Sequence, residues 1–166
     1  AQHPPTITPR APELIARLRA RGAAVHIVSG GFRAMIEPVA RAAFGGFSDE
    51  AEAETPRGAI YANTILWDAA TGAYVGFDPH EPTASDGGKP RVIERLKREH
   101  RYATVVMIGD GATDAQAKPP ADAFIGYGGV VQRDAVLAAA DWFVTDFQDL
   151  LDVLEHDDDD DDVGAH

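Results

Sequence analysis

The chain has no cysteine among its 166 residues, so it contains neither disulfide bonds nor thiolate metal sites. It also lacks an unbroken apolar run of about 18 residues, the length that a membrane-spanning helix needs. Basic residues are few, since 15 Lys and Arg stand against 27 Asp and Glu and the formal net charge is −12. No basic stripe with interleaved aromatic residues offsets that charge. We therefore expect neither a membrane nor a nucleic-acid partner, whereas a small anionic ligand in a locally positive site stays compatible with the composition.

What is present is enough for one globular domain. Hydrophobic residues make up 45% of the chain, which suffices for a core. Six of the acids form one run, Asp157–Asp162, and we expect residues 156–166 to be a disordered, solvated tail after a domain at 1–155. The first residue is Ala1, which we interpret as a truncation point. The composition does not decide the compartment, and we expect a soluble intracellular protein, in the cytoplasm or, with an upstream transit segment, in an organelle.

Helix-like and strand-like segments alternate, which is typical of an α/β layer fold with a mostly parallel sheet. Helices are predicted after Pro9 and Pro12, over 32–44, after a polar loop at 78–88, and from an N-cap at Thr145 or Asp146. A loop is predicted over 45–58. Residues 60–67 and 73–77 flank a turn and predict a β-hairpin. The other predicted strands are 23–28, 104–108, 123–126 and 142–144.

The most informative stretch is Gly109-Asp110-Gly111-Ala112-Thr113-Asp114, which directly follows a predicted buried strand. It therefore lies at the carboxyl edge of the sheet, where open α/β folds bind ligands. Two carboxylates four residues apart repel a phosphate unless a cation intervenes, and carboxylate oxygens suit Mg²⁺. A tight glycine turn with an aspartate helix cap is the alternative interpretation.

Two further segments suit an anion. Ser29-Gly30-Gly31 lies between a strand and a helix, where two glycines let the backbone approach an anion and the hydroxyl adds a donor. Lys89 lies in a first helical turn, where a cation is unfavourable against the helix dipole unless it has another purpose. Each segment has an ordinary alternative, an N-cap and a surface lysine respectively. Together they supply the positioning and charge neutralisation that phosphoryl transfer requires.

Four stretches coincide with a known family. The sequence resembles the phosphoserine phosphatases of the haloacid dehalogenase superfamily over most of residues 1–150. The stretches that carry the resemblance are IVSGGFRAMIEPVA (27–40), YVGFDPHEPTASDGGKPRVIERLK (74–97), VVMIGDGATDAQAKPPADAFIGYGG (105–129) and WFVTDFQDLL (142–151). It implies a Rossmann-like core with a small hairpin, an O-phosphoserine substrate, a Mg²⁺ cofactor and, as an open alternative, a homodimer.

The resemblance also implies roles for individual residues. Ser29, Gly30 and Gly31 would hold the phosphate and the serine moiety, and Lys89 would neutralise the phosphoryl group and the covalent intermediate. Asp110 would ligate Mg²⁺. Thr113 would lie beside the substrate, and Asp114 would orient Lys89 or the water shell of the metal.

One family feature has no match here. The nucleophile and the general acid/base of the family are aspartates in an Asp-x-Asp-x-Thr loop that precedes a substrate-selecting cap, and residues 1–166 contain no such loop. The strand before that loop is central in the family fold, between the 23–28 and 104–108 strands. We therefore expect the 166 residues alone to be inactive, and to aggregate, pair with another chain or fold only partly.

The favoured function is hydrolysis of O-phospho-L-serine to L-serine and phosphate through an aspartyl-phosphate, the last step of serine biosynthesis. Two alternatives stay open. One is a phosphatase for another small phosphorylated metabolite, because the selecting cap is out of view. The other is a non-catalytic module that binds phosphate or Mg²⁺.

Overall fold

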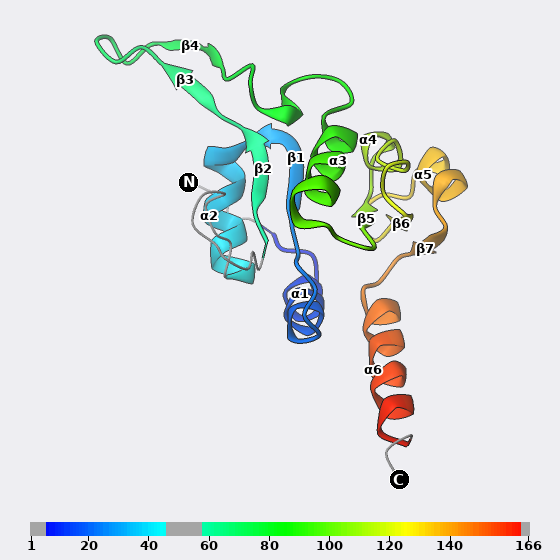
Figure 1. The fold of residues 1–166 in the computed structure, drawn as a ribbon. Helices are drawn as coiled ribbons and strands as arrows, with labels where there is room; N and C mark the ends of the chain where they lie inside the picture. The colour runs from blue at the N-terminus through cyan, green and yellow to red at the C-terminus, as the bar shows by residue number, and fades with distance from the viewer. Residues whose placement is uncertain (1–5, 46–57, 164–166) are drawn as a thin grey trace.

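The structure is a computed structural model that describes residues 6–45 and 58–163, with side chains as far as residue 156 (Figure 1). The predicted loop at 45–58 therefore lies almost entirely outside the described residues. The helices are α1 (Ala11–Ala20), α2 (Arg33–Phe44), α3 (Gly88–His100), α4 (Ala112–Ala115), α5 (Asp134–Ala139) and α6 (Gln148–Val163), with a short 3₁₀ helix η1 (Pro82–Ala84). The strands are β1 (Ile27–Phe32), β2 (Ile60–Asn63), β3 (Ile65–Trp67), β4 (Tyr74–Phe77), β5 (Val106–Gly109), β6 (Ala123–Tyr127) and β7 (Trp142–Val144).

The expected α/β fold is confirmed, but its parallel strands fall into two sheets instead of one. β1 and β2 form a parallel pair, and β5, β6 and β7 form a three-stranded parallel sheet in that order. β3 and β4 are an antiparallel hairpin. Among the described residues, β1 pairs only with β2, and β5 pairs only with β6. Each therefore has one unpaired edge, as expected from the absence of the family's central strand.

Two predicted strands differ from those observed. We expected Ser29-Gly30-Gly31 to break the strand at 23–28, whereas β1 begins at Ile27 and continues to Phe32. Pairing with β2 keeps this loop extended, with a register shift between Val28 and Phe32. Residues 60–63 were expected in the hairpin but pair with β1 instead. All four residues of β2 are buried, which is typical of a parallel strand covered on both faces.

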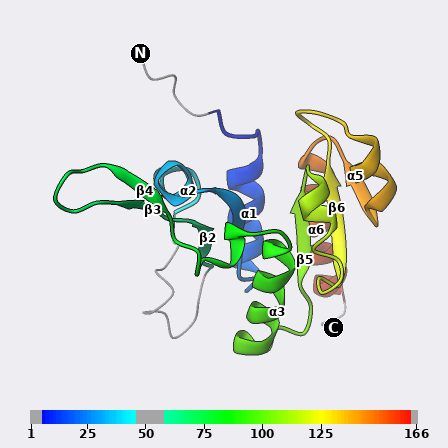
Figure 2. The same ribbon diagram turned by 90° about the horizontal axis from the view of Figure 1, so that it is seen from above.

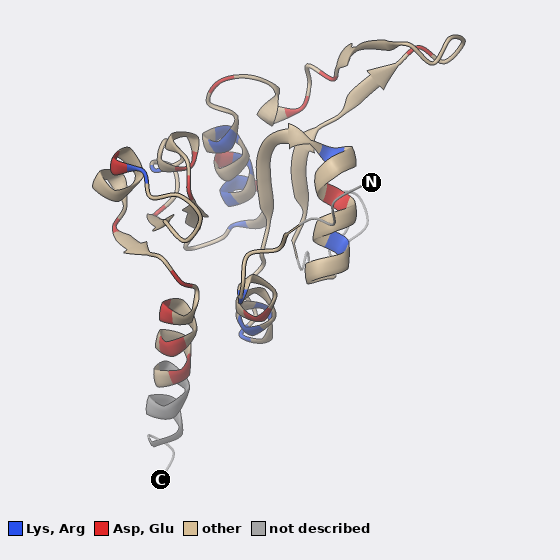
Figure 3. Ribbon diagram, turned by 180° about the vertical axis from the view of Figure 1, so that it is seen from behind, with Lys and Arg blue, Asp and Glu red and all other residues tan. Residues whose placement is uncertain are grey.

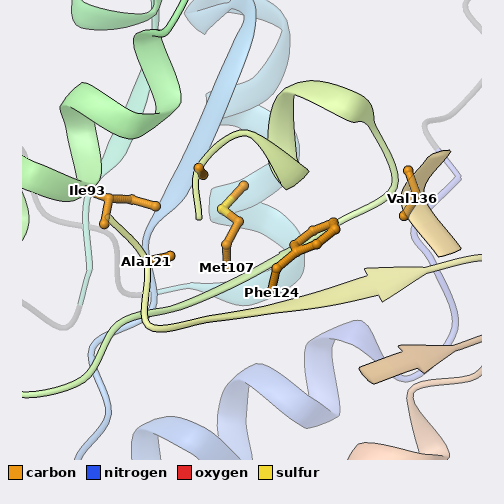
Figure 4. Close-up of a cluster of buried hydrophobic side chains, with 6 residues drawn as sticks. Ile93, Met107, Ala121, Phe124 and Val136 are labelled. Atoms are coloured by element: carbon orange, nitrogen blue, oxygen red, sulfur yellow. The ribbon is translucent and has the colours of Figure 1, made fainter. Parts of the chain in front are cut away.

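Helix α3 joins the two sheets because its side chains enter two separate cores. Ile93 packs with Met107, Ala117, Ala121, Phe124 and Val136 against the three-stranded sheet (Figure 4). Val92 and Leu96, on a neighbouring face of the same helix, pack with Ala59 and Tyr61 against β2. The helix thus fixes the distance between the two sheets, and its first turn lies where their carboxyl ends can meet.

The C-terminal segment is more helical than the sequence predicted. We expected a disordered tail over residues 156–166; within the described residues α6 continues to Val163, and residues 164–166 lie outside them. Its start is capped by the Asp146 carboxylate, which accepts a hydrogen bond of 2.9 Å from the Gln148 N–H. Leu150 and Leu151 are buried against Leu14 of α1 and Val144 of β7. Once packing has nucleated a helix, each added residue gains a hydrogen bond, so the helix extends into the acidic run.

None of the helices within the described ranges combines the length and the hydropathy that a bilayer crossing demands.

Candidate active site

The expected phosphate-binding segments meet around one open pocket of about 320 Å³. Gly30 in the second half of β1, Lys89 in the first turn of α3, and Thr113 in α4 all line it. They come from both halves of the fold, which is possible because α3 spans the two sheets (Figure 2). The structure therefore brings together three segments that are far apart in the sequence.

Lys89 and Asp114 form the central ion pair of this pocket. Their side chains are only 17% and 8% exposed, and the Lys89 ammonium donates to Asp114 Oδ1. The other carboxylate oxygen of Asp114 accepts a 2.9 Å hydrogen bond from the Gly111 N–H. This pairing offsets the unfavourable position of a cation at a helix start. Asp114 thus fixes both the lysine and the turn that follows β5, and the expected contact between Asp114 and Lys89 is present.

Gly109 is a glycine because the Asp114 carboxylate occupies the space of a side chain. A Cβ atom at residue 109 would lie 2.2 Å from Asp114 Cγ. At Gly111, two residues later, a Cβ atom would lie 3.3 Å from Asp114 Oδ2, which is close but not overlapping. The first glycine of the Gly-Asp-Gly turn is therefore required by packing, whereas the second is much less constrained.

Ser29, Gly30 and Gly31 have different environments. The Ser29 hydroxyl accepts a 3.1 Å hydrogen bond from the Gly31 N–H and so stabilises the loop itself. The Gly30 carbonyl accepts a 2.8 Å bond from the Asn63 side chain. Gly30 is the residue of this loop that lines the pocket. Direct contact of Ser29 and Gly31 with a substrate stays a prediction.

Two buried polar residues, not identified from the sequence, connect β1, β2 and η1 at the pocket. Asn63, at the carboxyl end of β2, and Thr83, in η1, both line it and are both buried. The Thr83 hydroxyl donates to Asn63 Oδ1 over 2.8 Å. A continuous chain of hydrogen bonds therefore runs from Gly30 through Asn63 to Thr83. The only signal in the sequence was a polar residue at the end of an otherwise apolar strand.

A second set of polar contacts stabilises the segment that leads into α3 and Lys89. Glu81 Oε1 accepts a 2.9 Å bond from the Thr64 hydroxyl and a 3.3 Å bond from Arg33. Arg33 also donates to the carbonyl of Ile60 over 2.8 Å. Gly88 packs directly on η1, since a Cβ atom there would lie 2.5 Å from the Pro82 carbonyl oxygen. These contacts hold the start of α3 against the ends of β1 and β2.

Asp110, the predicted metal ligand, directly follows β5, and its side chain is exposed. Its carboxylate and its carbonyl both accept hydrogen bonds from Arg133, at 2.5 and 2.6 Å. In the described residues, no three His, Asp or Glu side chains are grouped as a metal site. A single carboxylate can still serve Mg²⁺, which takes one or two protein carboxylates and completes its shell with phosphate and water. Asp110 therefore fits as one ligand of a shared site and not as a complete one.

Comparisons with known proteins show the family to which the chain belongs. The family model for haloacid dehalogenase-like hydrolases matches residues 1–117. The chain belongs to this family. It is 44% identical over 155 residues to the phosphoserine phosphatase of Bos taurus, which covers 93% of the chain and 64% of that protein. It is 42% identical over 156 residues to the chloroplastic phosphoserine phosphatase of Arabidopsis thaliana, which covers 93% of this chain and 49% of the plant protein.

Solved structures share the fold of this haloacid dehalogenase-like hydrolase. A phosphoserine phosphohydrolase-like protein from Francisella tularensis aligns with a TM-score of 0.68 over 89% of this chain and 62% of its own, at 24% identity. The chain thus spans less than two thirds of the length of the relatives that it matches. No segment within its 166 residues has the Asp-x-Asp-x-Thr pattern expected for the nucleophile.

Proposed function

We propose that this hydrolase is the core of a phosphoserine phosphatase that releases L-serine and phosphate from O-phospho-L-serine. The observation that carries the proposal is the single pocket lined by Gly30, Lys89 and Thr113, in which Asp114 holds the lysine in place. The 44% identity to the bovine phosphoserine phosphatase supports the choice of substrate. The reaction would complete serine biosynthesis.

The pocket suits a phosphomonoester because it offers the Lys89 ammonium and hydrogen-bond donors; the exposed Asp86 also lines it. The Lys89 ammonium would neutralise a phosphoryl group, and Thr113 and Asn63, which also line the pocket, carry further donor groups. The backbone of the Ser29-Gly30-Gly31 segment approaches the phosphate closely because it has no bulky side chain at Gly30. Asp110 would hold Mg²⁺ beside the pocket, where the metal would neutralise further phosphate charge.

The nucleophile of the proposed reaction lies outside residues 1–166. An aspartyl-phosphate intermediate requires a carboxylate that points at the phosphorus atom. In the described residues, both carboxylate oxygens of Asp114 already accept hydrogen bonds, from Lys89 and Gly111, and the acidic residue that lines the pocket is Asp86. The phospho-aspartyl intermediate analogue of phosphoserine phosphatase, a solved structure 23% identical to this chain, shares its fold. We therefore expect residues 1–166 to bind phosphate without turning substrate over.

A direct test compares residues 1–166 with the same chain extended by the sequence encoded upstream. The extended protein is expected to release phosphate from O-phospho-L-serine only with Mg²⁺, and residues 1–166 alone are expected to release none. A folded, monomeric 1–166 that turns over as fast as the extended protein would contradict the assignment. An upstream sequence without an Asp-x-Asp loop would contradict it as well.

The roles of Asp110 and Lys89 can be separated by metal rescue in the extended protein. Asp110→Asn weakens the metal site, so raising Mg²⁺ should restore part of the activity. Lys89→Ala removes a charge that the metal cannot replace, so its kcat should stay low at every Mg²⁺ concentration. Lys97→Ala is the matched control, because Lys97 lies on the same helix and pairs with Asp122 outside the pocket, at 2.7 Å. Equal rescue of both site variants would refute these roles.

The substrate is tested with a panel of small phosphomonoesters, since residues that select the substrate lie partly outside this chain. O-phospho-L-serine is expected to give the highest kcat/KM. A higher value for another metabolite would keep the phosphatase and replace its substrate. Binding of Mg²⁺ and phosphate without turnover of any panel member, in the extended protein, would show a binding module instead.

A further inference from the structure

The wall of the candidate pocket carries two charges of opposite sign. Among the described residues that line it, Lys89 is the basic one and Asp86 is the acidic one, at positions close together in the sequence. Figure 3 shows the same change of sign, since acidic positions in the loop before α3 give way to basic positions at the start of the helix. The proposed function uses Lys89 for the phosphate and gives Asp86 no role.

The Asp86 carboxylate has no partner within the part of the chain that the structure describes. The residue is exposed, and its hydrogen bond to Arg91 is made by the carbonyl oxygen, which accepts from the guanidinium over 2.8 Å. Lys89 does not neutralise the carboxylate, because the Lys89 ammonium is paired with Asp114. A carboxylate that lines a pocket in this state is available to a cationic group of a ligand.

The segment that carries Asp86 is held in place from α3. The Arg91 guanidinium donates to the carbonyl oxygens of Pro82, Ser85 and Asp86 at 2.9, 3.3 and 2.8 Å. It also donates to the Ser85 hydroxyl over 2.7 Å. The backbone then turns at Gly87, whose φ of 72° lies in the left-handed region that glycine adopts readily. Asp86 therefore has a defined place at the wall, and such preorganisation favours recognition of one particular group.

We propose that Asp86 determines specificity by binding the ammonium group of the substrate, an inference that rests on the proposed function. O-phospho-L-serine carries its phosphate and its ammonium on adjacent carbon atoms, and a pocket of about 320 Å³ is large enough for both. Lys89 serves the phosphate and Asp110 is the predicted metal ligand, so the ammonium is the cationic group of the substrate that Asp86 can pair with. An ester without an ammonium would bring only negative charge beside an unpaired carboxylate, which disfavours it.

The test measures kcat/KM of the extended protein for O-phospho-L-serine and for its deamino analogue, in which hydrogen replaces the ammonium group. Asp86→Asn keeps the shape of the side chain and removes its charge. It is expected to lower kcat/KM for O-phospho-L-serine on the order of tenfold or more, and to leave the value for the deamino ester unchanged or higher. Asp149→Asn is the matched control, because Asp149 is an exposed aspartate of α6 that does not line the pocket, and it should change neither value.

Three results would refute the role of Asp86. Equal losses with the two esters would show that Asp86 supports the loop and does not bind the ammonium. Wild-type selectivity in Asp86→Asn would show that the carboxylate is only solvated. Recovery of Asp86→Asn at high Mg²⁺ with both esters would assign the carboxylate to a metal ion.

A binding measurement separates this inference from the proposed function. Failure of the extended wild-type protein to hydrolyse either ester would refute the proposed function alone. Calorimetry then decides the role of Asp86, since Asp86→Asn should raise the Kd for O-phospho-L-serine on the order of tenfold and leave the Kd for inorganic phosphate unchanged. Equal changes in the two Kd values, or no change in either, would overturn the inference.

Discussion

Replacing Gly109 by alanine should disable the pocket without touching any residue that lines it. The added methyl group would lie 2.2 Å from Asp114 Cγ and 2.3 Å from Asp114 Oδ2, so the carboxylate must move. Moving it weakens two hydrogen bonds, one from Lys89 and one from the Gly111 N–H. Overpacking typically costs about 1–3 kcal/mol. A shift of about 1 Å in a catalytic group costs on the order of 100-fold in rate.

The assay measures kcat/KM of the extended protein for O-phospho-L-serine together with the free energy of unfolding in urea. Gly109→Ala should lower both quantities, the first by on the order of 100-fold. Gly111→Ala is the matched control in the same turn, because its methyl group would lie 3.3 Å from Asp114 Oδ2 and needs only a slight adjustment. Wild-type kcat/KM in Gly109→Ala, or an equal loss in Gly111→Ala, would show that the position of Asp114 does not control the site.

Three further predictions concern buried groups away from the ion pair. Burial, reinforced by the nearby charge of His100, lowers the pKa of His26 from 6.5 to about 4. The unfolded chain therefore binds a proton that the folded chain excludes, and stability should fall as pH drops from 6.5 to 4, by on the order of 2 kcal/mol. His26→Gln should lose this dependence in urea titrations across that range, and an unchanged slope would refute it. Phe124→Ala should cost about 3–5 kcal/mol, since the ring is fully buried at the centre of the three-stranded sheet; differential scanning calorimetry would measure this, and a loss below 1 kcal/mol would contradict it. Thr83→Val keeps the shape but leaves Asn63 Oδ1 without its donor, and should cost about 1–3 kcal/mol and raise the Kd for inorganic phosphate. An unchanged Kd in calorimetry would show that this hydrogen bond does not position the pocket.

The local features of the fold could be read from the sequence because short-range physics decides them. Apolar runs predicted β5, β6 and β7, and the turn at 68–72 predicted the hairpin. The Asp146 cap gave the start of α6, although its end at Val163 depends on propagation beyond the packed turns. Pairing partners could not be read in the same way, since β2 and β3 form one apolar run that divides between two sheets only when β1 pairs with β2.

In the candidate site, too, the sequence determined the local features and the tertiary structure decided the pairing. The sequence alone predicted that Ser29-Gly30-Gly31, Lys89 and the carboxylates of Asp110 and Asp114 suit a phosphate and a cation, because their chemistry and their places at strand ends and a helix start are local features. The resemblance to a known family added Thr113. The tertiary structure decided which groups pair: Lys89 binds Asp114, Arg133 binds Asp110, and Asn63 links Gly30 to Thr83. These contacts join residues 20 to 33 positions apart. No local pattern encodes such distances, because they are set by the way α3 packs between two sheets.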